Sequence, residues 1–127
     1  MTAAEFRVAI EALGIDQGTA AELLGVTDRT VRRWIAGTHD IPAGAAADVR
    51  KIEAHTDDFV DAVVEQLIEG EPDEDGQRWV LTHASDAAYR TLHPDAHLPA
   101  SWHRAAMGRV AREVHGVRLH YPTQEDD

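Results

Sequence analysis

Apolar residues in the first 52 positions recur at helical spacing, in four short runs separated by glycine or proline. The first run follows Thr2-Ala3-Ala4-Glu5, whose Thr-x-x-Glu pattern is typical of a capping box, and it ends at Gly14. The second and third runs lie on either side of Gly25, and the fourth follows Pro42. The pattern predicts four helices in this part of the chain.

The run after Gly25 separates its apolar and charged residues most clearly of the four, on opposite sides of the expected helix. Thr27 is a good N-cap, because its hydroxyl can accept a hydrogen bond from a backbone N–H of the first turn. Asp28 follows, where its charge complements the helix dipole. Val31 and Trp34 are spaced for one buried stripe. On the outward side lie Arg29, Thr30, Arg32 and Arg33.

Beyond residue 52 the helical spacing continues to Gly70 without an intervening glycine or proline. Thr56 is followed by two aspartates, which is typical of a new helix start. We therefore expect the fourth helix to end near His55 and a fifth to begin at Thr56. Residues 77–83 and 117–121 alternate in polarity and predict two short strands, and the runs beginning at Ser85 and Ser101 predict two more helices.

These elements predict a mainly α fold with two domains. Residues 1–55 form a bundle of four to five helices, residues 56–122 form a small α+β domain with two short strands, and residues 123–127 form a disordered acidic tail. Two strands are marginal alone and need cover from helices or from another molecule. We therefore expect a homodimer through the second domain, with interface residues Phe59, Val63, Trp79, Trp102 and Leu119.

Composition limits the class of protein. The 127 residues are 43% hydrophobic and contain no cysteine, which excludes disulfides and thiolate metal sites and fits a reducing compartment. The N-terminal residues lack the basic, apolar and small-residue order of a signal peptide. No apolar run approaches membrane-spanning length. These features predict a cytoplasmic protein with no membrane partner.

Charge is distributed unevenly along the chain. The formal net charge is −11. Residues 1–55 contain six Lys and Arg against eight Asp and Glu, whereas residues 56–127 contain six against fifteen. Nucleic-acid-binding proteins are usually basic, so any such role would depend on the three arginines concentrated at positions 29–33. Weak affinity of one copy would then favour a dimer.

The stretch from Ile15 to Gly37 resembles the helix-turn-helix of the lambda repressor and Cro type. The residues that carry the resemblance are Ile15, Gln17, Ala21, Leu24, Gly25, Val26, Thr27, Thr30, Val31, Trp34 and Gly37. The departures are Gly18 inside the first helix, Ala20 in place of a leucine and Ala36 in place of an asparagine. The resemblance implies a two-helix core of Ala21, Gly25, Val31 and Trp34.

In such a fold the second helix enters the DNA major groove with its N-terminal residues near the base edges. Arginine can pair there with both acceptors of a guanine. We therefore assign base contacts to Asp28, Arg29, Thr30 and Arg33, and backbone contacts to Gln17, Thr27, Arg32 and His39. The expected ligand is double-stranded DNA, with no cofactor.

In length and order of elements, the whole chain resembles the anti-CRISPR-associated autoregulators of phages and mobile elements. Those proteins combine an N-terminal helix-turn-helix with a small α+β dimerisation domain. The resemblance implies a homodimeric transcriptional repressor that binds an inverted repeat in its own promoter and controls its own operon.

Other interpretations remain open. The two helices could form a protein-docking module, since fold does not fix function, or an antitoxin-like regulator whose second domain also binds a toxin. A small metal enzyme would use His93, His97 and His103, but Pro94 and Pro99 interrupt the helix that would align them, so we expect solvated loop histidines. His83, Ser85 and Asp86 lack a nucleophile elbow. The sequence predicts neither catalysis nor a metal site.

Overall fold

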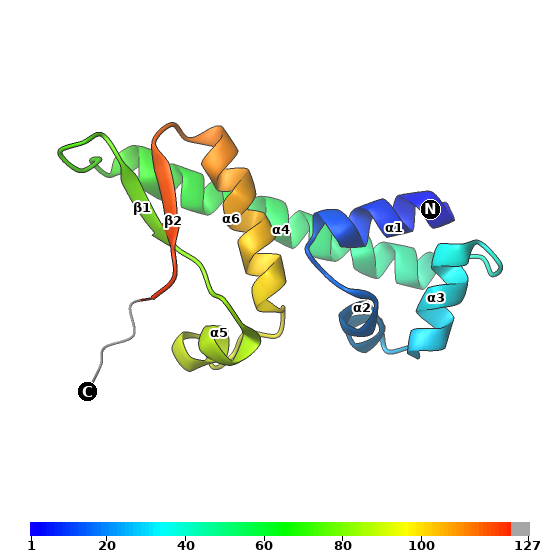
Figure 1. The fold of residues 1–127 in the computed structure, drawn as a ribbon. Helices are drawn as coiled ribbons and strands as arrows, with labels where there is room; N and C mark the ends of the chain where they lie inside the picture. Colours follow the sequence, from blue (N-terminus) through cyan, green and yellow to red (C-terminus); the bar gives the residue numbers. More distant parts are fainter. Residues whose placement is uncertain (123–127) are drawn as a thin grey trace. The chain divides into compact units, whose positions relative to one another are not determined.

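The computed structural model describes residues 1–122, which are mainly helical and include one two-stranded parallel sheet (Figure 1). This confirms the predicted fold class at that level. The predicted disordered tail, residues 123–127, lies outside the described residues. The elements in chain order are α1 (Ala3–Ala12), α2 (Gln17–Leu24), α3 (Asp28–Ala36), α4 (Ala43–Glu69), β1 (Arg78–Leu81), α5 (Asp86–Leu92), α6 (Ala100–Glu113) and β2 (Val117–His120).

The chain forms two compact units, one from Met1 to Asp57 and the other starting at Asp58. The boundary between them falls inside α4, two residues after the predicted one. No helix within residues 1–122 is both long enough and apolar enough to cross a membrane.

Local capping fixes the ends of the first three helices. Thr2 and Glu5 form the predicted capping box, with hydrogen bonds of 2.9 and 3.0 Å. Gly25 and Gly37 end α2 and α3 in the left-handed region, with φ of 68° and 77°. Other residues adopt this conformation at a cost of roughly 1–2 kcal/mol, so glycine suits both turns.

The core of the first unit forms where α1 crosses α3. Phe6 is fully buried and its ring meets that of Trp34 edge-on, with centroids 5.7 Å apart. Edge-to-face pairs of this kind add roughly 0.5–1.5 kcal/mol beyond the burial of area. The other buried apolar side chains of this unit are Ala9, Ile10, Leu13, Ile15, Ala20, Ala21, Val31 and Val49.

The predicted break between His55 and Thr56 is wrong, because α4 continues through both residues. Thr56 is buried, and its hydroxyl donates a 2.7 Å hydrogen bond to the carbonyl oxygen of Ile52, one turn earlier. A threonine hydroxyl bonded to the i−4 carbonyl is compatible with a helix interior. Threonine is a favoured residue at the start of a helix, but Thr56 lies in the middle of one.

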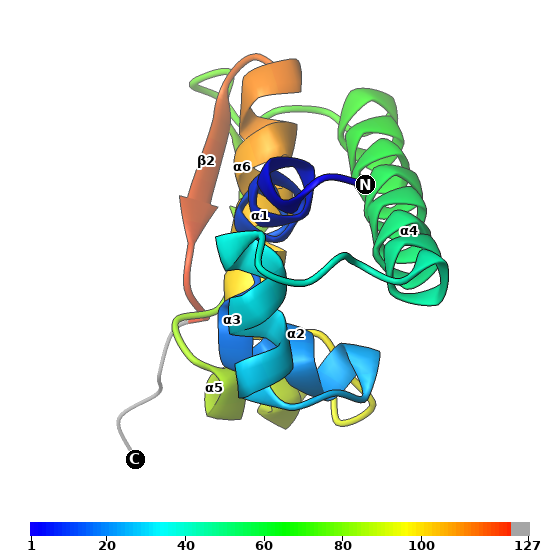
Figure 2. The same ribbon diagram turned by 90° about the vertical axis from the view of Figure 1, so that its right-hand side faces the viewer.

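The second unit is built on a parallel pairing of β1 with β2, in which Trp79 faces Arg118 and Leu81 faces His120. Helices α4 and α6 lie on one side of this sheet, and no element of the second unit up to residue 122 covers the other side (Figures 1 and 2). On the covered side, Val80 packs against a core of Val60, Ala106, Met107 and Val110.

The predicted elements of this unit were slightly displaced. The strands are shorter than the predicted 77–83 and 117–121, and α6 begins at Ala100 instead of Ser101. The start of α6 is held by Asp86, whose carboxylate accepts a 2.8 Å hydrogen bond from the Ala100 N–H. This contact spans fourteen positions, which local sequence patterns do not reveal.

The acidic loop before β1 is ordered by Asp73. Its carboxylate accepts hydrogen bonds from the N–H groups of Asp75 and Gln77 and from the indole N–H of Trp79, at 2.9, 2.8 and 3.1 Å. The hydrogen bond from the backbone N–H of Gln77 is the main reason that the pKa of Asp73 is lowered. The Arg78 guanidinium donates to the carbonyl oxygens of Leu67 and Gly70, and so caps the C-terminus of α4.

Candidate nucleic-acid interface

Helix α3 is anchored on one side and open on the other. Val31 and Trp34 are buried, at 0% and 4% exposure. Thr27 caps the helix, and its hydroxyl oxygen accepts a 3.2 Å hydrogen bond from the Thr30 N–H. On the opposite side Asp28, Arg29 and Arg32 are exposed, and Arg33 is half-buried. The helix therefore presents its cations outward while its apolar stripe holds it to the core.

The arginines of α3 have no acidic partner in the described part of the chain. No ion pair or hydrogen bond within residues 1–122 involves the guanidinium groups of Arg29, Arg32 or Arg33. By contrast, Arg7 pairs with Glu11 and Arg50 with Glu53, each at 2.8 Å. Arg29 stands three and four positions from the other two, a spacing at which like charges on a helix repel. An external anion would relieve that repulsion.

The capping residue Thr27 and Thr30 of α3 are already hydrogen-bonded to one another. The hydroxyl oxygens of Thr27 and Thr30 lie 3.0 Å apart. Because a hydroxyl has one proton and two lone pairs, the pair retains limited capacity for an outside ligand. Thr30 is also half-buried, as is Arg33, whereas the other two predicted base-contacting residues are exposed.

Gln17 and His39, two predicted backbone contacts, lie on segments next to α3. Gln17 is the exposed first residue of α2. His39 is exposed just beyond α3, and its Nδ1 lies 3.2 Å from the Thr38 hydroxyl, which itself donates to the Arg33 carbonyl at 3.3 Å. These contacts tie the loop after α3 back to the helix.

Asp16 is the residue beside this surface that sequence reasoning missed. It caps α2, and its carboxylate accepts a 2.7 Å hydrogen bond from the Thr19 N–H, which lowers the pKa of Asp16. The signal was present, because Asp is a favoured N-cap and stands directly before Gln17. A carboxylate at this helix start disfavours a phosphate there, which makes Gln17 a weaker candidate for an anion contact than the arginines.

The groups considered for catalysis have separate structural partners. The Ser85 hydroxyl accepts a 3.1 Å bond from the Ala88 N–H and so caps α5. The Asp86 carboxylate holds the start of α6. His83 is buried against Tyr89, with ring centroids 4.8 Å apart. The three side chains form no hydrogen-bonded series within the described chain.

The expected solvation of all three candidate metal-ligand histidines is wrong for one of them. His93 and His97 are exposed, but His103 lies within α6 and is 8% exposed. Its Nδ1 is 2.9 Å from the Thr82 hydroxyl, and its ring is 4.9 Å from that of His83. Within residues 1–122, no three His, Cys, Asp or Glu side chains are grouped to hold a metal ion.

The five predicted interface residues do not form one surface. Trp102 is 3% exposed and packs on Phe59 at 5.0 Å between ring centroids, so it has little area to offer a second subunit. Phe59 and Val63 are partly buried against the core. Trp79 and Leu119 lie on opposite sides of the sheet, because Leu119 pairs in register with Val80. The structure therefore does not support a common contact of these five side chains.

A scan of the chain against protein-family models finds no match, and a search of curated proteins finds no significant relative. The geometry and charge of α3 are therefore the ground on which a function can be proposed.

Proposed function

We propose that this protein is a sequence-specific DNA-binding repressor that acts in the cytoplasm as a homodimer on an inverted-repeat operator. In this proposal α2 and α3 act as a helix-turn-helix, and α3 enters the major groove. Autoregulation, with the operator in the protein's own promoter, is part of the same proposal. No catalytic step, metal or cofactor belongs to it.

The observation that carries the proposal is the unpaired cationic side of α3. Three guanidinium groups crowd one side of a nine-residue helix that is held by Val31 and Trp34. A duplex supplies both kinds of acceptor that such a surface needs, phosphate oxygens along the backbone and O6 and N7 of guanine in the groove. The exposure of Arg29 near the start of α3 makes it the first candidate for base contact.

Charge on the rest of the chain supports a specific binder over a general one. With a formal net charge of −11, most of the surface repels phosphate. Binding then depends on the few residues of α3, and two copies on adjacent half-sites would combine their contacts. For a symmetric dimer, the half-site centres should be about 10 base pairs, or a multiple of that, apart.

The test compares two arginines of α3 in quantitative binding to DNA from the region upstream of the gene. Arg29→Ala should cost about 1–3 kcal/mol per half-site and relax the preference at one base position. Arg32→Ala should weaken binding to all sequences alike and reduce the salt dependence by about one unit per lost phosphate contact. Footprinting gives the half-site spacing.

Arg7→Ala is the matched control, because Arg7 is an exposed arginine on α1 that pairs with Glu11. It removes one positive charge from the same unit and should leave operator affinity within about twofold. Neither α3 arginine belongs to the buried stripe, so all three variants should melt as the wild type does. Normal operator binding by folded Arg29→Ala protein would contradict the assignment of α3 and favour a protein-docking module.

A further inference from the structure

We propose that the uncovered side of the two-stranded sheet binds the same surface of a second copy of this chain. We call this surface the open sheet face and define it by Trp79, Leu81, Arg118 and His120. In the proposed contact, Arg118 of each copy meets the acidic loop of the other, defined here as residues 71–75. The inference rests on the proposed function, because it identifies the surface that joins two DNA-contacting helices.

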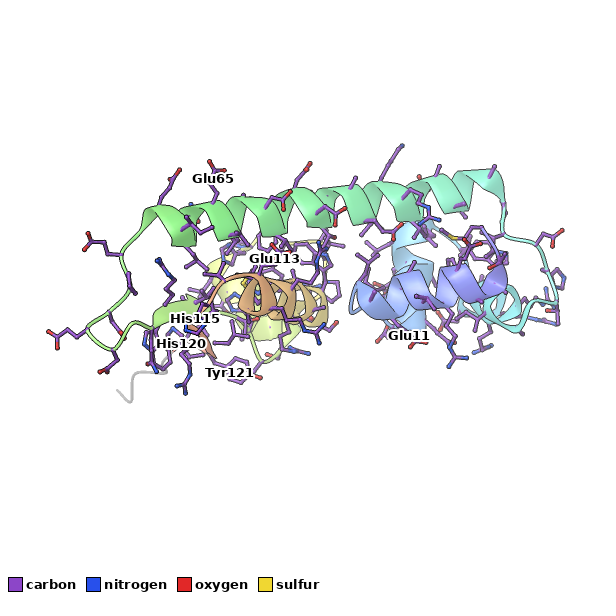
Figure 3. All side chains as sticks on the ribbon, turned by 90° about the horizontal axis from the view of Figure 1, so that it is seen from above. Glu11, Glu65, Glu113, His115, His120 and Tyr121 are labelled. Atoms are coloured by element: carbon purple, nitrogen blue, oxygen red, sulfur yellow. The ribbon has the colours of Figure 1, made fainter. Side chains whose placement is uncertain are left out.

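The register of the sheet places these four side chains on one side. Trp79 pairs with Arg118, and Leu81 with His120, and paired residues of a parallel ladder project to the same side. The contacts agree: the Arg118 guanidinium carbon lies 5.3 Å from the centre of the Trp79 ring, and the His120 ring lies 5.4 Å from that ring. Figure 3 shows His120 on the side of this unit away from α4, whereas Glu65 projects from the far side of α4.

The open sheet face exposes apolar area that a folded protein usually covers. Trp79 is 50% exposed and Leu81 is 43% exposed. A two-stranded sheet is marginal without cover on its apolar surface, and no element of the second unit up to residue 122 provides it on this side (Figures 1 and 2). Both strands also have an unpaired edge in the described chain.

Charge complementarity identifies the occupant as a second copy. The strands RWVL and VRLH contain no Asp or Glu, although residues 56–127 contain fifteen. Two copies of an acidic chain repel each other over most surfaces, and the open sheet face is where carboxylates are missing. Arg118 makes no ion pair within residues 1–122, so its charge is available to a partner.

The acidic loop supplies the opposite charge next to the same surface. The Asp73 carboxylate accepts the indole N–H of Trp79 at 3.1 Å, which fixes the loop beside the start of β1. A two-fold axis running along the strands would lay β2 of one copy over β1 of the other. Arg118 would then lie over the N-terminal end of the other copy's β1, next to the acidic loop that precedes that strand. The contact would be made twice because a two-fold interface repeats every pair.

The test is a charge exchange between full-length chains, read by sedimentation velocity. Arg118→Glu alone brings acid against acid, and Glu71→Lys with Glu74→Lys alone removes the net negative charge of the loop and brings two lysines toward Arg118. Each variant should raise the dimer dissociation constant at least about tenfold, the effect of about 1.4 kcal/mol. An equimolar mixture should restore the dimer, because the carboxylate introduced at position 118 of one variant then faces the two introduced lysines of the other, whose Arg118 faces an unchanged acidic loop. Asp73 is left unchanged because it orders the loop.

Ile68→Glu is the control, since Ile68 is 64% exposed on α4 and lies outside the open sheet face. It adds a carboxylate to the same unit and should leave the dimer intact. Restoration of the dimer in the mixture shows that the separate variants are folded. A wild-type chain that is monomeric at tens of micromolar, or that gains mass only with a foreign protein, overturns the inference, as does a dimer unaffected by Arg118→Glu and Leu81→Glu.

The two proposals fail in different ways. A monomer whose DNA binding still depends on Arg29 overturns the contact between copies and leaves the DNA-binding role. A dimer that responds to the charge exchange as expected but binds no DNA would support the contact between copies and overturn the DNA-binding role.

Discussion

Two histidines of the second unit are held as neutral bases inside the protein. His83 and His103 are 2% and 8% exposed, and their rings lie 4.9 Å apart. Burial lowers the pKa of His83 and lowers that of His103 to about 4, with the neighbouring histidines adding to both effects. The Nδ1 of His83 is buried without a hydrogen-bond partner among the described residues, so the site has no acceptor for an added proton there.

This burial predicts a loss of stability on acidification. Because the folded pKa of His103 lies below the unfolded value of about 6.5, the unfolded chain binds protons first as the pH falls. The contribution of His103 to the free energy of unfolding should be nearly constant above pH 7 and should drop by about 2 kcal/mol between pH 7 and pH 5. Urea denaturation at several pH values measures this.

Two variants separate this effect from other titrations. His103→Gln keeps a polar partner for Thr82 and should flatten the dependence between pH 7 and pH 5, whereas His97→Gln, at an exposed histidine, should not change it. The carboxylates with lowered pKa, such as Asp16 and Asp73, affect stability only at lower pH. Identical profiles for wild type and His103→Gln would contradict the prediction.

At the scale of elements, β1 and β2 meet through a close approach of two glycines. Gly116 has φ +81°, and a Cβ at this position would lie 2.5 Å from the carbonyl oxygen of Gly76. The Gly116 carbonyl accepts a 2.8 Å hydrogen bond from the Arg78 N–H, which begins the ladder. Any shift at Gly116 therefore disturbs the first hydrogen bond between the strands.

Substitution of these two glycines should have unequal effects. Gly76→Ala meets nothing within 4 Å and carries only the strain of its φ of +77°, about 1 kcal/mol. Gly116→Ala adds a backbone clash and should lower the free energy of unfolding by at least about 2 kcal/mol more. Urea denaturation at one fixed protein concentration compares them, and equal losses would show that the strands adjust freely.

How far the sequence predicted the elements depended on whether their signals were local. The caps at Thr2, Thr27 and Ser85 were found because each depends on residues within one turn. Thr56 misled the prediction because its burial depends on tertiary packing, which its neighbours in sequence do not reveal. The parallel pairing of the strands depends on contacts between distant segments, which alternation of polarity does not encode.

The same distinction applies to the candidate site. The exposure of Arg29 and Arg32 was predicted because their positions fall outside the helical stripe of Val31 and Trp34, whereas Arg33, also expected to lie outward, is half-buried. The sequence did not predict that His103 and Trp102 are buried, which limits their availability to a metal ion or to a second subunit. This burial arises from packing of α6 against Phe59. Periodicity assigns a side chain to a stripe, but it does not say whether the chain itself or a partner covers that stripe.

At the scale of the whole molecule, the acidic charge should suppress binding to unrelated DNA. Non-specific affinities of DNA-binding proteins are typically about 10⁻⁴ to 10⁻⁶ M, and this chain should fall at or beyond the weak end. Replacing Asp58, Asp61 and Glu65 by their amides should strengthen non-specific binding, because these exposed carboxylates of α4 repel phosphate. Fluorescence anisotropy with random duplexes measures this.

Specific binding should respond less to the same three changes, so the ratio of specific to non-specific affinity should fall. An unchanged ratio would mean that the charge of α4 has no part in selectivity. His97→Gln serves again as a control, since it alters an exposed residue of the second unit without changing its count of carboxylates.

The parallel pairing of β1 with β2 also has a kinetic consequence. Strand β1 finds its partner only after residues 82–116, including α5 and α6, have been synthesised and brought back to it. Closing such a segment costs chain entropy before any contact compensates for it, and parallel pairing of distant strands is slow for that reason. Until then, Trp79 and Leu81 lie on an unpaired strand edge, a known template for aggregation. In pulse-labelled hydrogen exchange, the amides of β1 and β2 should gain protection later than those of α1 and α3.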